Sequence, residues 1–185
     1  MEMIVIDTET TGLSQRYNKV LTVGMLHIDV DKDFLKIINR KHILVKHEDY
    51  AIDPKALEIN KINLSEHHKI ALEPPKACSQ INKFINKKNL EEKPLLGHNI
   101  TFDIRFLNEL FRQGDLIPSF SHDFIDTMHI WSALKRKNFV SFNLRNSLQT
   151  LAGYFKVDYS KAHSALGDCY ITANVYKKML DLIKT

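Results

Sequence analysis

The stretch that decides the fold is Met3-Ile4-Val5-Ile6-Asp7-Thr8-Glu9-Thr10-Thr11-Gly12-Leu13. Its apolar start predicts a short buried strand, which the acidic residues follow directly. Residues two apart on a strand point to the same face, so Asp7 and Glu9 are expected side by side, with Cβ atoms roughly 6–7 Å apart. Two such charges repel unless a cation lies between them, and paired carboxylates suit magnesium or manganese. A solvated strand end with an Asp/Thr/Gly turn is the alternative reading of this stretch alone.

The segments around this strand predict the rest of the sheet and its helices. β-branched and apolar runs predict further strands at Val20–Val30, Phe34–Lys46, Pro94–His98 and Phe124–Thr127. Apolar residues at helical spacing, and a helix-opening proline, predict helices near Pro54–Ile59, Ala77–Ile85, Phe102–Phe111, Met128–Leu134, Leu148–Phe155 and Ala165–Ile183. Three early strands followed by alternating strands and helices predict an α/β fold, with one mixed sheet flanked by helices.

The composition indicates an ordinary soluble domain. The chain has 185 residues, 44% hydrophobic and 26% charged, which predicts a single domain over residues 1–185. No long apolar run predicts a membrane span, and no secretory signal precedes the first strand, so a cytoplasmic protein is expected. Cys78 and Cys169 give no disulfide framework and no zinc spacing, and are expected to be small buried residues. The net charge of +4 is compatible with a polyanionic partner.

A second acidic segment is Gly97-His98-Asn99-Ile100-Thr101-Phe102-Asp103. A strand is expected to end near His98, and Asn99 is a plausible N-cap of the helix that follows. Asp103 would lie in an early turn, where the helix dipole favours a carboxylate. Taken alone, Asp103 is better explained as an exposed dipole-complementing residue, and His98 as a hydrogen-bonded structural histidine rather than a ligand.

A third segment is His163-Ser164-Ala165-Leu166-Gly167-Asp168. Five residues within a helix would turn the two side chains to different faces, so they converge only if His163 stands in the loop before the helix. Histidine has an ordinary pKa near 6.5, which suits a general base at neutral pH. The alternative is a helix-entry histidine beside an ordinary surface aspartate.

Taken together and in this order, the three segments resemble the motifs of the DEDDh family, the DnaQ-like 3′→5′ exonucleases. Asp7 and Glu9 match the first motif, Asp103 the second, and His163 with Asp168 the third. The resemblance covers essentially the whole chain. Within the family, the sequence is similar to the exonuclease X and polymerase III epsilon branches. It implies an RNase H-like fold with a mixed five-stranded sheet. A tyrosine subclass would carry Tyr at the position of Ser164.

The resemblance also implies a mechanism with two Mg²⁺ or Mn²⁺ ions. Asp7, Glu9 and Asp168 would hold the ion that activates the water. Asp7 and Asp103, directly or through water, would hold the ion that stabilises the leaving 3′ oxygen. His163 would deprotonate the water, and the product would be a nucleoside 5′-monophosphate. The substrate implied is a nucleic acid with a free 3′ end, with single-stranded DNA favoured, in repair or proofreading.

The family further implies that Thr10, Thr11, Gly12 and Leu13 receive the terminal nucleotide. Leu13 is either an apolar wedge under the base or a core residue. Phe102 and Asn99 are weighed in the same way, as substrate contacts against core packing and helix capping. Lys135-Arg136-Lys137, with Arg145, is a further candidate for backbone contacts, although cations at a solvated helix end are the preferred reading.

Three hypotheses remain at this point. The first is a DNA exonuclease, and the second acts on RNA or short oligoribonucleotides with the same five residues. The third is a non-catalytic nucleic-acid-binding or polymerase-associated module, which the five intact acidic and histidine positions disfavour. The chain ends soon after the helix carrying Asp168, which favours a free-standing nuclease over one with a polymerase-binding tail. The oligomeric state is not encoded in any pattern of the sequence.

Overall fold

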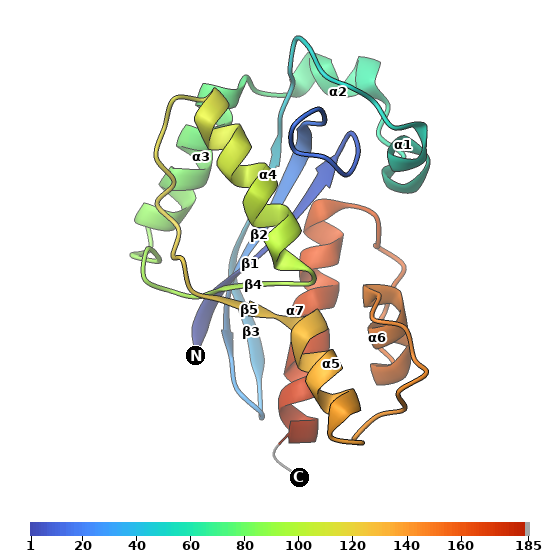
Figure 1. Cartoon of the computed structure of the whole chain (residues 1–185). Helices are drawn as coiled ribbons and strands as arrows, with labels where there is room; N and C mark the ends of the chain where they lie inside the picture. The colour runs from blue at the N-terminus through green and yellow to red at the C-terminus, as the bar shows by residue number, and fades with distance from the viewer. Residues whose placement is uncertain (184–185) are drawn as a thin grey trace.

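The computed structural model describes residues 1–183 and contains the expected five-stranded sheet (Figure 1). The strands are β1 Glu2–Thr10, β2 Val20–Val30, β3 Leu35–Leu44, β4 Leu95–Gly97 and β5 Phe124–Asp126. Their order is β3-β2-β1-β4-β5. β1, β2 and β3 pair antiparallel, and β4 and β5 add on parallel to β1. The prediction of one mixed sheet is confirmed.

Helices cover both faces of this sheet (Figure 1). They are α1 Pro54–Asn60, α2 Leu64–Ile70, α3 Pro74–Asn86, α4 Ile100–Gln113, α5 Thr127–Arg136, α6 Leu148–Phe155 and α7 Ala165–Ile183. α3 and α4 pack together on one face, and α7 crosses the other with α5 and α6 beside it. In residues 1–183 no helix combines the length and the apolar character needed to span a membrane.

The central strand β1 divides its side chains between these two layers. Ile4 and Ile6 belong to the apolar core beneath α3 and α4, whereas Met3 and Val5 belong to the core beneath α7. Because side chains alternate along a strand, the odd-numbered acidic residues that follow face the α7 layer, and Thr8 faces the α4 layer.

The start of α4 differs from the prediction. Asn99 occupies the N-cap position, but its backbone is left-handed, with φ 60°, and its side chain makes no capping bond. The carboxylate of Asp126 accepts hydrogen bonds from the backbone N–H groups of Asn99 and Ile100 at 2.9 and 3.2 Å instead. The predicted capping role of Asn99 is therefore wrong, because an aspartate at the end of β5 already supplies the acceptor.

The two cysteines are as expected. Cys78 and Cys169 are both free and both buried, each within one of the two main apolar cores. Burial raises the pKa of both thiols, that of Cys78 to about 11. Both residues therefore behave as small apolar groups.

Candidate active site

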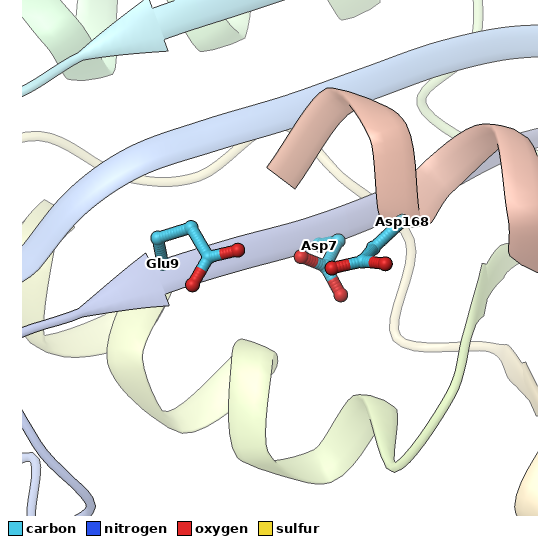
Figure 2. Close-up of side chains that lie close together, drawn as sticks. All are labelled: Asp7, Glu9 and Asp168. Carbon is cyan, nitrogen blue, oxygen red and sulfur yellow. The ribbon is translucent and has the colours of Figure 1, made fainter. Parts of the chain in front are cut away.

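Three carboxylates that are far apart in the sequence lie together at the end of β1 nearest Thr10. Asp7 and Glu9 extend from β1, and Asp168 reaches them from the first turn of α7 (Figure 2). One oxygen from each of the three lies within 4.8 Å of the others. The structure thus joins the first and third predicted motifs in one cluster, which we call the carboxylate cluster.

A glycine on β2 allows α7 to come this close to the sheet. Gly24 pairs with Asp7 across the antiparallel register. A Cβ atom at Gly24 would lie only 2.4 Å from the backbone carbonyl of Ala165, the first residue of α7. Only glycine tolerates this approach, which brings the first turn of the helix, with Asp168, beside Asp7.

The carboxylate cluster is electrostatically strained. Burial and the charges of Asp103, Asp168 and Glu9 raise the pKa of Asp7 well above its usual value. Burial, with the charge of Asp168, raises the pKa of Glu9 to about 8. The pKa of Asp168 rises to about 6, again chiefly through burial. Carboxyl groups that are buried beside other carboxylates resist ionisation unless a cation compensates their negative charge.

The remaining predicted carboxylate, Asp103, is held separately. It lies in the first turn of α4 and is buried, so the reading of it as an exposed dipole-complementing residue is wrong. Its Oδ1 accepts hydrogen bonds from the backbone N–H of Thr8 at 2.9 Å and from the Thr8 hydroxyl at 2.7 Å. Its pKa rises to about 7 through burial, against the opposing effect of these bonds. Asp103 is near enough to raise the pKa of Asp7 but does not join the carboxylate cluster.

His163 stands in the loop before α7, as predicted. Its backbone is left-handed, with φ 67°, and its N–H donates to Asp168 Oδ2 at 3.1 Å. Its exposed side chain packs edge-on against the ring of Tyr159, with centroids 5.9 Å apart. The charges of Asp168, Asp7 and Glu9 add to burial in raising the pKa of Tyr159, so this residue also lies near the cluster. No sequence pattern singled out Tyr159.

The predicted nucleotide-binding residues begin at Thr10, the last residue of β1, and continue into the turn after it. The Thr10 hydroxyl donates to the carbonyl of Gly12, and the Thr11 hydroxyl donates to the carbonyl of Ala51, each at 2.7 Å. These bonds fix the turn after the strand. Leu13 is 78% exposed, so its alternative reading as a core residue is wrong.

Other predicted positions have structural partners. Phe102 is half-buried and packs against Phe106, with ring centroids 4.7 Å apart. His98 bonds through Nδ1 to the Thr127 hydroxyl at 2.9 Å, which confirms the structural reading of that histidine. Lys135 is buried and donates to the carbonyl of Leu144, so neither a solvated face nor a phosphate contact describes it.

The donor set of the carboxylate cluster fits a hard divalent metal ion. All its ligand atoms are carboxylate oxygens, as Mg²⁺ and Mn²⁺ prefer. Asp168 Oδ1 is buried and has no hydrogen-bond partner among the described residues. A buried carboxylate oxygen without a donor is costly, and a cation at this position would satisfy it.

Comparison with known families fits this geometry. A family model described as exonuclease matches residues 4–176. The chain belongs to this exonuclease family. The predicted enzyme class, a 3′→5′ exonuclease of the DnaQ-like type, is thereby confirmed.

Two curated relatives illustrate the range of the exonuclease family. The DNA polymerase III subunit epsilon of Salmonella typhimurium is 31% identical over 192 residues, which cover 95% of this chain and 70% of that protein. The ribonuclease T of Buchnera aphidicola is 26% identical, over 98% of this chain and 85% of that protein.

Solved structures of exonucleases share the fold. E. coli exonuclease I in complex with a dT13 oligonucleotide superposes with a TM-score of 0.78 at 19% identity, over 96% of this chain and 40% of that one. The nuclease domain of 3′hExo, a DEDDh family member bound to rAMP, gives 0.78 at 17% identity, over 97% and 91%. The predicted RNase H-like fold is confirmed. The chain spans about 40% of the length of exonuclease I.

Proposed function

We propose that this chain is a metal-dependent exonuclease domain that shortens DNA from its 3′ end and releases nucleoside 5′-monophosphates. The observation that carries the proposal is the carboxylate cluster, in which Asp7, Glu9 and Asp168 converge with a buried oxygen lacking a donor. A bound divalent cation would compensate the repulsion between these carboxylates and would be ligated by their oxygens.

The cluster would hold one metal ion, and Asp7 with Asp103, directly or through water, would hold a second. Two ions, when bound, supply charge stabilisation to the attacking and leaving oxygens of a phosphodiester. Thr8 contributes by fixing one oxygen of Asp103 with two hydrogen bonds, which leaves the other oxygen for a ligand.

His163 is proposed as the general base. A ring nitrogen would take a proton from water as the water oxygen bonds to phosphorus and the bond to the leaving 3′ oxygen breaks. The backbone bond to Asp168 and the edge contact with Tyr159 support this role, because they hold the histidine beside the cluster. Its exposed position leaves room for substrate.

Thr10, Thr11, Gly12 and Leu13 are proposed to receive the terminal nucleotide. Leu13 supports this because an exposed apolar side chain, four residues after Glu9 in the chain, can pack under a base. Asn99 and Phe102 remain candidates for substrate contacts at the start of α4.

The preference for DNA rests on the relative with the higher identity, a subunit of DNA polymerase III. That likeness also supports roles in repair or proofreading. RNA is the second candidate, because ribonuclease T is similar over nearly the whole chain. Two free buried cysteines are compatible with the cytoplasmic location that we propose.

The test uses 5′-labelled single-stranded DNA and RNA of the same sequence, with Mg²⁺, Mn²⁺ or EDTA. We expect a metal-dependent ladder that shortens from the 3′ end, and the faster substrate decides between DNA and RNA. His163→Ala should slow the ladder, whereas His122→Ala, an exposed histidine on the loop between α4 and β5, should not. A folded protein that degrades neither substrate with either metal would support a binding module instead.

A further inference from the structure

A groove of about 550 Å³ runs beside α7, bounded by Arg40 of β3 and by the loop that leads to His163. The α7 residues that line it recur at helical spacing and are Gly167, Tyr170, Ile171, Asn174 and Lys178. The last of these residues lies eleven positions after the first along the helix, so this wall is about 16 Å long. The wall begins at Gly167, in the first turns of α7 and directly before Asp168 in the chain, although none of the cluster residues lines the groove itself.

The groove is strongly basic. Its cations are Arg40, Lys156, Lys161 and Lys178, and its one carboxylate is Asp158. Asp158 is already engaged by the backbone N–H and the hydroxyl of Ser160. Among residues 1–183 none of the four cations forms an ion pair, whereas lysines elsewhere, such as Lys46 and Lys177, do. Unpaired cations around a concave surface favour a polyanion.

The groove lies within reach of a strand that ends at the carboxylate cluster. Arg40 pairs with Leu26, which pairs with Val5, two residues before Asp7. Arg40 is therefore two strands across and two residues along from Asp7, about 10 Å and about 7 Å respectively. A chain of a few nucleotides covers that distance.

An aromatic ring stands among these cations. Tyr170 lines the groove, and Arg40 Nη1 donates to its hydroxyl at 3.2 Å. This bond fixes both side chains at the groove wall. Single-stranded nucleic acids are bound by this combination of phosphate-binding cations and aromatic rings on which bases stack.

We propose that this groove holds the single-stranded nucleic acid upstream of the 3′-terminal nucleotide, with phosphates on Lys161, Lys178 and Arg40. The inference rests on the proposed function for the identity of the polyanion. It adds a binding surface, away from the carboxylate cluster, that makes affinity depend on the length of the strand.

The test measures binding of fluorescent 3-mers and 15-mers of DNA and of RNA by anisotropy, in EDTA so that no turnover occurs. Lys161→Ala/Lys178→Ala removes two exposed groove cations and leaves the cores intact. Lys76→Ala/Lys88→Ala is the matched control, because it removes two exposed lysines of the α3 side, neither of them in an ion pair. Lys178→Glu provides a second groove variant, and thermal melts confirm that each protein is folded.

For the 15-mer, the negative slope of log affinity against log salt should be shallower by about 1.4 in the groove variant, since each phosphate contact on a single strand contributes about −0.7. Between 50 and 200 mM salt the unchanged protein should lose about sevenfold more affinity than the variant. The preference for the 15-mer over the 3-mer should shrink in the groove variant and persist in the control. The proposal that the groove binds nucleic acid would be overturned by equal salt slopes for the two double variants, or by the absence of a length preference in the unchanged protein.

Cleavage assays run in parallel separate this inference from the proposed function. Normal 3′→5′ cleavage without a groove effect would reject the groove alone. A groove effect on binding without metal-dependent cleavage would reject the nuclease and leave the nucleic-acid groove standing. The DNA and RNA arms show which strand the groove prefers.

Discussion

The two faces of β1 meet carboxylates in different surroundings. Towards α7, Asp7 and Glu9 meet Asp168, and a buried oxygen of Asp168 has no donor among the described residues. Towards α4, Asp103 lies outside the carboxylate cluster and accepts two hydrogen bonds from Thr8. One face therefore holds a group of carboxyl groups that hinder one another's ionisation, and the other holds a single carboxylate fixed by hydrogen bonds.

This difference shows that different side chains of one strand contribute to the stability of the fold and to the proposed metal site. Apolar residues of β1 and its neighbours bury both faces and tolerate the local repulsion. On the α7 face, the clustered carboxylates destabilise the metal-free protein, and a bound cation would relieve this. On the α4 face, the hydrogen bonds from Thr8 hold Asp103 in one position. Substitutions on the two faces should consequently have opposite effects on stability.

The largest effect is expected from Asp7→Asn on the α7 face. Loss of a ligand shared by both proposed metal ions should reduce cleavage about 1,000-fold, or about 4 kcal/mol in the activation barrier. The metal-free protein should melt at a higher temperature, because asparagine removes a carboxyl group whose ionisation is disfavoured in the folded state by burial and by its acidic neighbours. Steady-state cleavage of labelled DNA and melting in EDTA measure the two effects.

Asp115→Asn is the control for charge alone, because Asp115 is exposed in the turn after α4. It should change neither the cleavage rate nor the melting temperature appreciably. Normal cleavage by Asp7→Asn would overturn the metal assignment, and a lower melting temperature would contradict the strained α7 face.

A smaller effect is expected from Thr8→Val on the α4 face. Valine keeps the shape and the backbone N–H but removes the hydroxyl that bonds to Asp103. Activity should fall about 10–100-fold, as for other residues that orient metal ligands. Stability should fall by about 1–2 kcal/mol, because a buried carboxylate loses a donor. Thr8→Ser, which keeps the hydroxyl, should restore most of both.

Measurement of the Mg²⁺ dependence makes this test specific. If Thr8 positions Asp103, the deficit of Thr8→Val should narrow as the Mg²⁺ concentration rises. A deficit that is the same at every concentration would point to a general packing defect instead.

Much of this two-faced arrangement follows from local sequence. β2, α6 and α7 have the predicted bounds, because β-branched runs and helical periodicity act over short distances. β1 continues through its acidic residues to Thr10, beyond the apolar run that predicted it. Pairing with β2 maintains the strand there, with Glu9 opposite Thr22.

The features that escaped prediction depend on contacts between distant segments. Asp126 takes over the capping of α4 from Asn99 across 27 residues. The hydroxyl of Thr8 reaches Asp103 across 95 residues. Gly24 matters only because α7 folds onto β2 at that point. Local pattern identifies which residues are special, and only tertiary packing shows which of them meet.

Next in size is the effect of pH on the metal-free protein. The pKa of Glu9 is raised to about 8 and that of Asp103 to about 7, so the folded state binds more protons than the unfolded state between pH 6.5 and 8. Stability should therefore fall as pH rises through this range, by about 1–2 kcal/mol. Melting in EDTA at several pH values measures it.

Magnesium should oppose this fall, because it pairs with the ionised carboxylates. The melting temperature at pH 8 should then approach that at pH 6.5. Five histidines with lowered pKa values act in the opposite direction, because their unfolded forms still bind protons near the ordinary pKa of 6.5; they are His27, His42, His47, His67 and His98. Their effect is confined to the acidic edge of this window and fades towards pH 8, where the carboxyl groups dominate. A melting temperature in EDTA that rises from pH 6.5 to 8 would refute the strained cluster.

The smallest effect is expected from Leu13→Ala, three residues beyond the end of β1. Leu13 is 78% exposed, so its removal should change stability by less than about 0.5 kcal/mol. If it packs under the terminal base, kcat/KM should fall about fivefold, which corresponds to about 1 kcal/mol of apolar contact. Ile117→Ala, at an 85% exposed position, is the matched control and should alter neither quantity. Equal kcat/KM for the two variants would remove Leu13 from the nucleotide site, whereas a loss confined to Leu13→Ala would extend that site past the strand.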